Sequence, residues 1–168
     1  MSATRYDVLG IGNAIVDLLA RAEDDFLVKQ RMHKGGMQLI DEARAEAIYD
    51  AMGPAVEVSG GSAANTIVGV ASFGARAAFV GKVKDDSLGR VFGHDIRAAG
   101  VAFETPPASE GPSTGRCYIL VTPDGERTMN TFLGAAQDLH PNDIDADVIA
   151  ATEIVDDSAI GLIVVVFG

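Results

Sequence analysis

Short apolar runs typical of strands alternate along this chain with runs that have helical spacing, and glycines stand at several junctions. The strand-like runs are 7–11, 55–58 and 77–83, and the helical ones are 41–52, 63–73 and about 87–99. Gly74 and Gly100 directly follow two of the helical runs, at the position where glycine commonly ends a helix. This alternation predicts an α/β fold with a partly parallel sheet flanked by helices.

Three further segments lie outside this alternation, and they are predicted to form a hairpin, an apolar run and a short helix. Residues 115–122 and 127–132 flank the turn sequence Pro123-Asp124-Gly125-Glu126, and we expect them to form a hairpin. Residues 14–20 form a further apolar run after a corner at Gly12 and Asn13. Residues 142–152 are predicted to form a short acidic helix.

Charge and cysteine content exclude several classes of protein. Thirteen Lys and Arg against 24 Asp and Glu give a net charge of −11, so no nucleic-acid partner is expected. Cys117 is the single cysteine, which excludes an internal disulfide and a multi-cysteine metal site, and no metal site is predicted. The longest apolar run, 162–167, is far shorter than the roughly 20 residues of a membrane span. With no signal peptide recognised either, we expect a cytoplasmic protein.

Two of the three glycine motifs fail as nucleotide-binding sites. The sequence from Gly10 begins like a dinucleotide fingerprint, but Ile15 stands where the third glycine or alanine is required. Gly81 and Lys82 are followed by Val83 rather than by the Ser or Thr of a P-loop. A dinucleotide-binding oxidoreductase is therefore only a distant third hypothesis.

The remaining motif, Gly60-Gly61-Ser62-Ala63-Ala64-Asn65, precedes a helix. Backbone N–H groups without Cβ atoms in the way, at the start of a helix, suit a polar ligand, although a tight turn is the more common explanation of an isolated glycine pair. Asn13 and Asp17 favour the ligand, because an apolar core has no use for their acceptors.

Five motifs in order then resemble the ribokinase (PfkB) family of sugar and nucleoside kinases, most closely its adenosine-kinase-like branch. They are VLGIGNAIVD at 8–17, GGSAAN at 60–65, FVGKVKDDSLG at 79–89, PSTG at 112–115 and GERTM at 125–129. The resemblance covers about 7–144 and implies a ribokinase-like α/β fold with a small β lid near 13–40 and 101–132. It also implies ATP- and Mg²⁺-dependent phosphorylation of a hydroxymethyl group on adenosine or a ribose-like acceptor.

The resemblance assigns roles to individual residues. It implies that the acceptor is bound by Asn13, Asp17, Gln38, Gly60, Gly61, Ser62 and Asn65. By the same resemblance Arg127 faces the transferring phosphoryl group, although a surface arginine between acidic neighbours is an equal alternative. For Gln38, a solvated loop position is the more common explanation, and contact with the acceptor is the alternative that the resemblance implies.

The end of the chain departs from the family. The sequence stops at Gly168 without the family's GAGD motif, and 156–167 does not resemble the expected continuation. We therefore expect residues 1–168 to be the N-terminal part of one ribokinase-like domain, truncated or frame-shifted near Val155, without the catalytic Asp and most of the ATP site. Such a chain would be inactive alone. The alternative is a non-catalytic sugar- or nucleoside-binding or interaction module that forms a homodimer through its lid strands.

Overall fold

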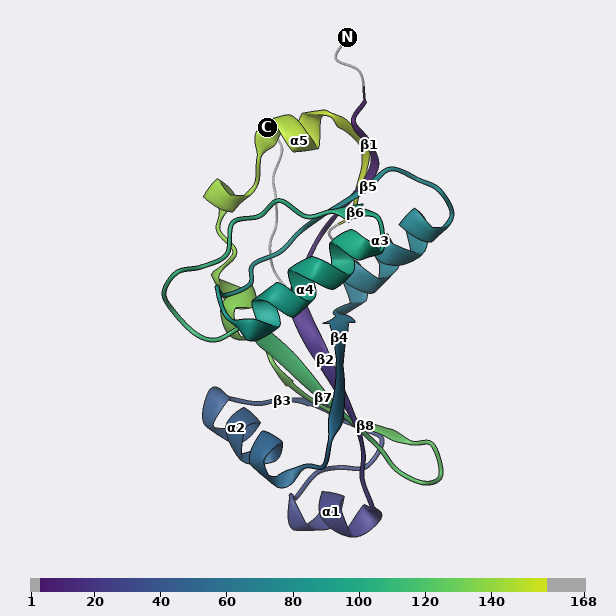
Figure 1. Ribbon diagram of the computed structural model, residues 1–168, viewed down its shortest axis with the longest axis vertical. Coiled ribbons are helices and arrows are strands. Elements are labelled where there is room, and N and C mark those ends of the chain that lie inside the picture. The colour runs from purple at the N-terminus through teal and green to yellow at the C-terminus, as the bar shows by residue number, and fades with distance from the viewer. Residues whose placement is uncertain (1–3, 157–168) are drawn as a thin grey trace.

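The computed structural model describes residues 4–156, which form two sheets with helices packed against them (Figure 1). The first sheet has four strands in the order β6-β5-β1-β9, and the second has five in the order β3-β8-β7-β2-β4. No helix among the described residues is long and apolar enough to span a membrane. The α/β class that the sequence predicts, with a partly parallel sheet flanked by helices, is the class observed.

The four-stranded sheet is entirely parallel. β1 (Tyr6–Ile11) lies between β5 (Ala77–Val80) and β9 (Thr152–Asp156), and β6 (Val101–Ala102) pairs with β5. All four residues of β5 are buried, as expected for a parallel strand with both faces covered.

Helices cover both faces of this sheet. On one face α3 (Ser62–Ser72) and α4 (Ser87–Ala98) enclose a core that includes Phe79, Phe92 and Phe103. The rings of Phe92 and Phe103 meet edge to face, with 5.2 Å between their centroids. On the other face the short helix α5 (Ala146–Ala150) packs on a separate apolar cluster.

The five-stranded sheet is mixed. β2 (Ile15–Arg21) pairs parallel with β7 (Gly115–Val121) and antiparallel with β4 (Ala55–Gly60). β8 (Arg127–Phe132) forms the predicted hairpin with β7, and β3 (Met37–Leu39) closes the edge. α1 (Asp24–Lys29) and α2 (Glu42–Ala51) lie beside this sheet, at the lower end of the molecule in Figure 1.

Several predicted helix ends are confirmed. Asp41 caps α2 by accepting a hydrogen bond from the backbone N–H of Arg44 at 2.8 Å. Asp86 caps α4 in the same way, accepting a hydrogen bond from the backbone N–H of Gly89 at 2.8 Å. Gly74 has a φ of +93° just after α3, which a residue with a Cβ rarely adopts.

The prediction of one helix over 142–152 is wrong. The segment contains a 3₁₀ turn at Pro141–Asp143, then α5, and then the start of β9. Thr152 is the first residue of β9, which pairs with β1. Pairing in the sheet therefore overrides the helical preference that the local sequence indicates at this residue. The strand expected over 77–83 also ends earlier, at Val80. The predicted change of sequence character in 156–167 falls, apart from Asp156, outside the described residues.

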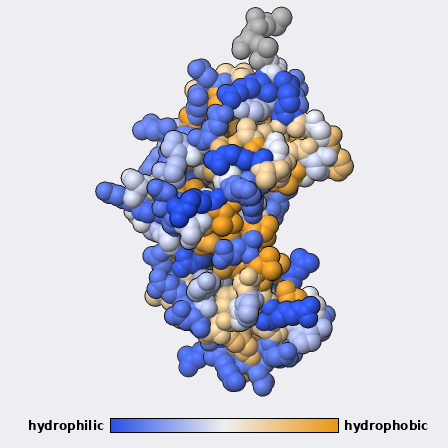
Figure 2. Space-filling model, in the orientation of Figure 1, coloured by the Kyte–Doolittle hydropathy of each residue, from blue (hydrophilic) through white to orange (hydrophobic). Residues whose placement is uncertain are grey.

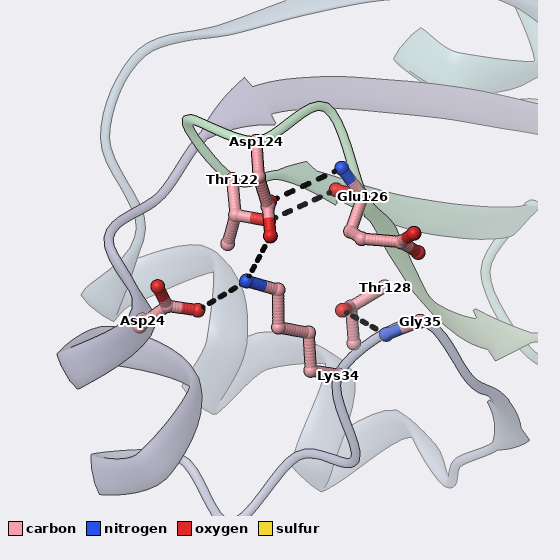
Figure 3. Close-up of polar contacts among 7 residues, drawn as sticks. All are labelled: Asp24, Lys34, Gly35, Thr122, Asp124, Glu126 and Thr128. Carbon is pink, nitrogen blue, oxygen red and sulfur yellow. Dashed lines mark hydrogen bonds and ion pairs between the residues drawn. The ribbon is translucent and has the colours of Figure 1, made fainter.

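An ion-pair network fastens the tip of the β7–β8 hairpin to the segment before β3 (Figure 3). The Lys34 ammonium group lies 2.7 Å from both the Asp24 and the Asp124 carboxylates. The backbone N–H of Gly35 donates to Thr128 Oγ1 at 3.1 Å. The chain around residue 34 thereby links α1 to the hairpin turn.

Candidate functional site

Asp17 and Gly60 lie against each other on neighbouring strands of the five-stranded sheet. Asp17 is the third residue of β2, and Gly60 is the last residue of β4, paired with Ile15. A Cβ at residue 60 would overlap the Asp17 carboxyl group. Glycine is therefore required at residue 60 for the carboxylate to occupy its position.

Gly61 completes the connection from β4 to α3. Its φ of +97° is in the region that favours glycine, and a Cβ there would lie 2.5 Å from the carbonyl oxygen of Asn13. This close approach brings the corner between β1 and β2 next to the start of α3. Asn13, Asp17 and the glycine pair thus form one cluster, although they come from segments far apart in the sequence.

The first turn of α3 faces the same cluster. Gly61 is the N-cap residue and provides no side-chain cap, so the first backbone N–H groups of the helix keep free donor capacity. Ser62 and Asn65 lie in this turn and are exposed. The structure therefore brings together six of the predicted residues, namely Asn13, Asp17, Gly60, Gly61, Ser62 and Asn65.

The Asp17 carboxylate is half-buried and has no hydrogen-bond partner among residues 4–156. Burial raises the pKa of this carboxyl to about 6. The carboxylate oxygens have lost part of their hydration and have gained no protein donor in exchange. A ligand whose hydroxyl or N–H groups donate hydrogen bonds to them therefore gains binding free energy. The cluster is accordingly suited to a neutral molecule with several hydroxyl groups.

Gln38 lies elsewhere. Its side-chain amide donates to Asn130 Oδ1 at 2.6 Å, and its register partner Asn130 is fully buried. Side chains alternate between the faces of a sheet, and Asn130 is opposite Tyr118, whereas Asp17 is opposite Cys117. Gln38 therefore lies on the same face of the sheet as Asn130, and Asp17 lies on the other face.

Arg127 shares the face of Asp17 but not its immediate surroundings. It pairs with Val121, four positions along β7 from Cys117, the partner of Asp17. Four positions correspond to about 13 Å along a strand. Arg127 is exposed and makes no ion pair among the described residues, so its guanidinium group is available to an anion.

The face of the five-stranded sheet that carries Asp17 is also unusually apolar for an exposed surface. Its exposed members are Leu19, Val56, Val58, Met37 and Leu39. Figure 2 views the molecule from the side of α4, where hydrophobic surface is also visible below that helix, near β4. Sequence reasoning did not single out these residues, although the valines at alternate positions of 55–60 were an available signal.

Within residues 4–156 no group of three or more His, Cys, Asp or Glu side chains is arranged to bind a metal ion. We therefore assign no described residue to Mg²⁺.

The fold has close counterparts among solved structures. The adenosine kinase from Sinorhizobium meliloti is 57% identical, with a TM-score of 0.84 over 90% of this chain and 46% of that one. A probable sugar kinase from Rhizobium etli is 53% identical, with a TM-score of 0.84 and the same coverage. The adenosine kinase from Schistosoma mansoni in complex with adenosine is 26% identical, with a TM-score of 0.75, covering 92% and 46%.

Curated relatives give a consistent result over a shorter stretch. Probable fructokinase-4 of Arabidopsis thaliana is 31% identical over 111 residues, which are 65% of this chain and 34% of that protein. The 5-dehydro-2-deoxygluconokinase of Shouchella clausii is 27% identical over 153 residues, or 89% and 40%. The chain thus spans about a third to two fifths of these relatives and just under half of the solved structures. Residues 40–162 match the pfkB family of carbohydrate kinases, and the chain belongs to that family.

Proposed function

We propose that this chain is the acceptor-binding part of an ATP-dependent kinase that phosphorylates a hydroxymethyl group of a nucleoside or sugar, with adenosine as the first candidate and ribose or fructose as alternatives. The observation that carries the proposal is the half-buried Asp17 carboxylate, without a hydrogen-bond partner in residues 4–156, beside Gly60. The 57% identity to an adenosine kinase supports the choice of nucleoside.

The geometry of the cluster fits a ribose ring. An ionised Asp17 accepts hydrogen bonds from two neighbouring hydroxyl groups, and each charge-assisted bond contributes about 1.5–3 kcal/mol. Asn13 and Asn65 carry amides that both donate and accept. The backbone at Gly60 and Gly61 allows a sugar to approach closely, because neither residue has a Cβ.

The chemistry of transfer needs groups beyond this cluster. ATP supplies the phosphoryl group and Mg²⁺ neutralises part of its charge in kinases generally. In this chain Arg127 would contact the transferring phosphoryl group, since a guanidinium group binds phosphate oxygens in a bidentate manner. Arg127 lies on the same face of the sheet as Asp17, four positions farther along β7, so the two side chains would contact different parts of the reacting pair. From the family resemblance we also propose that 13–40 and 101–132 contribute a lid.

We further propose that the 168 residues bind the acceptor but transfer phosphate very slowly when alone. Residues 1–168 do not contain a GAGD motif. The family resemblance places the catalytic base in that motif, together with the helix N-terminus that binds the developing anion. Loss of a general base typically lowers the rate by about 10² to 10⁴. Loss of the donors that stabilise the developing charge lowers it by about another 10² to 10³.

Titration calorimetry with adenosine, ribose and fructose tests the binding site. We expect adenosine to bind the 168-residue chain and Asp17→Ala to abolish that binding. Asp50→Asn is the matched control, because Asp50 is exposed on α2, away from the cluster. Equal binding by wild type and Asp17→Ala would remove Asp17 from its proposed role.

A kinase assay with ATP, Mg²⁺ and each acceptor tests the second part. We expect no turnover above the uncatalysed background. Measurable turnover would show that the 168 residues contain a complete catalytic apparatus, contrary to the proposal.

The apolar sheet face also supports a homodimer through the lid strands. Val56 and Met37 are 68% and 61% exposed, which is costly in a monomer. Sedimentation of the wild-type chain and of Val56→Lys tests this: the proposal requires a dimer that the lysine disrupts.

A further inference from the structure

A groove runs beside α4, and no residue of the Asp17 cluster lines it. It has a volume of about 560 Å³ and lies between α4, the segment after β5 and the segment after β6. Gly89 and Gly93 line it from α4, and the missing side chain of Gly93 leaves room for the Arg97 guanidinium group, which would lie 3.1 Å from a Cβ at residue 93. A volume of this size accommodates a small metabolite.

The groove is basic, although the chain is strongly acidic. Lys84, Arg90 and Arg97 line it, together with His94, whereas Asp85 is the one carboxylate among its lining residues. Asp85 offsets little of this charge, because its 3.5 Å ion pair with Arg90 joins side chains that are 69% and 70% exposed. In a chain of net charge −11, three cations around one groove form a local site for an anion.

Arg97 is held in place without any acidic partner. Its Nε donates to the carbonyl oxygen of Phe103 at 3.1 Å, and Nη1 donates to that of Gly93 at 2.8 Å. The guanidinium group also lies over the Phe103 ring, 5.6 Å from its centroid. Among the described residues no carboxylate forms an ion pair with it. Its charge is therefore oriented in advance and left uncompensated, as an anion site requires.

Thr105 provides a second, independent observation. This residue is only 8% exposed, and it lies between the groove and a second cavity beside β1 and β5, lining both. Its hydroxyl is the buried side-chain polar atom that lacks a hydrogen-bond partner within residues 4–156. A buried hydroxyl without a partner is costly, and an oxygen-rich ligand would satisfy it.

We propose that this groove binds the phosphate group of a small phosphorylated metabolite, with Arg97, Arg90 and Lys84 contacting the phosphate and Thr105 donating a hydrogen bond. Val83, Phe103 and Pro107 supply apolar walls for the rest of the molecule. The site is separate from the acceptor cluster and does not depend on the function proposed above. Phosphate alone and the phosphate of a sugar ester share this recognition chemistry.

Calorimetric titration of the 168-residue chain with ribose 5-phosphate and with inorganic phosphate tests the proposal. We expect ribose 5-phosphate to bind and Arg97→Gln to weaken its binding at least about tenfold. Arg21→Gln is the matched control: it removes the same charge from an exposed residue of β2 that does not line the groove. No binding by wild type, or equal weakening by both variants, would overturn the proposal.

Backbone amide NMR locates the bound molecule without relying on any variant. We expect ribose 5-phosphate to shift the resonances of Gly93, Arg97 and Thr105, with smaller effects at Gly60 and Gly61. Shifts confined to the glycine pair would contradict the proposal, because they would place the ligand at the acceptor cluster. Groove shifts with inorganic phosphate as large as those with the sugar ester would show that the groove recognises phosphate alone.

Discussion

The Asp86 carboxylate joins the two sheets by binding Thr114. It accepts hydrogen bonds from the Thr114 backbone N–H at 2.9 Å and from its hydroxyl at 2.7 Å, and it also caps α4 through the N–H of Gly89 at 2.8 Å. Thr114 is fully buried and directly precedes β7. One carboxylate thus fixes the start of a helix on one sheet to the start of a strand in the other.

Thr114→Val should destabilise the fold by about 1–3 kcal/mol, because it leaves a charged acceptor without one of its donors in a buried setting. Urea unfolding followed by circular dichroism measures the change. Thr66→Val, at an exposed position of α3, is the control and should have a much smaller effect. A difference near zero between the two variants would mean that water replaces the lost donor.

Acceptor binding should depend on pH through Asp17. Because burial raises the pKa of this carboxyl to about 6, about a tenth of the molecules carry the charge at pH 5. A ligand that donates hydroxyl groups binds the ionised form, so adenosine affinity should rise about tenfold between pH 5 and pH 7.5 and level off above that. Calorimetry across this range checks the profile. An unchanged affinity over the range would contradict the assignment.

Asp17→Asn should stabilise the folded chain at pH 7 while it weakens adenosine binding. The pKa of Asp17 in the folded state lies above its ordinary value of 3.8, so the folded state binds the proton more tightly and Asp17 favours folding at low pH. That contribution is lost as pH rises from about 4 to about 6. After allowance for solvent screening of this half-buried group, the gain at pH 7 is about 1 kcal/mol. Thermal unfolding of both proteins at pH 4 and pH 7 checks this. The variant should be more stable than wild type at pH 7, and this difference in stability should vanish at pH 4.

Gly60→Ala should abolish adenosine binding, because its Cβ would displace the Asp17 carboxylate. Gly69→Ala is the control: no atom lies within 4 Å of a Cβ built there, in the middle of α3, and alanine favours a helix. The control should bind normally and be slightly more stable. Normal binding by Gly60→Ala would show that the carboxylate is not constrained by residue 60.

Lys34→Met should loosen the tip of the β7–β8 hairpin, since it removes both ion pairs that fasten the turn. These pairs are partly exposed, so salt should weaken them in the wild type. Hydrogen exchange at Gly125 and Glu126 should be faster in this variant and in wild type at high salt. Lys29→Met, in the last turn of α1, should leave that exchange unchanged.

Both the fold class and the resemblance to the PfkB family could be predicted from the sequence, whereas the binding role of the cluster around Asp17 stays a prediction. Local patterns carry this information: Gly74 directly follows an apolar run with helical spacing and so predicts where that helix ends, and the Gly60-Gly61 pair stands just before another helix. The hairpin from 115 to 132 followed from its turn residues alone.

Only the tertiary structure decided which side chains share a face and which are left without partners. Strand pairing placed Gln38 beside Asn130, away from Asp17, and drew Thr152 from a helix into β9. The basic groove beside α4 arises because separate segments bring Lys84, Arg97 and Thr105 to one place. Such contacts depend on the register and packing of distant segments, which local periodicity does not encode.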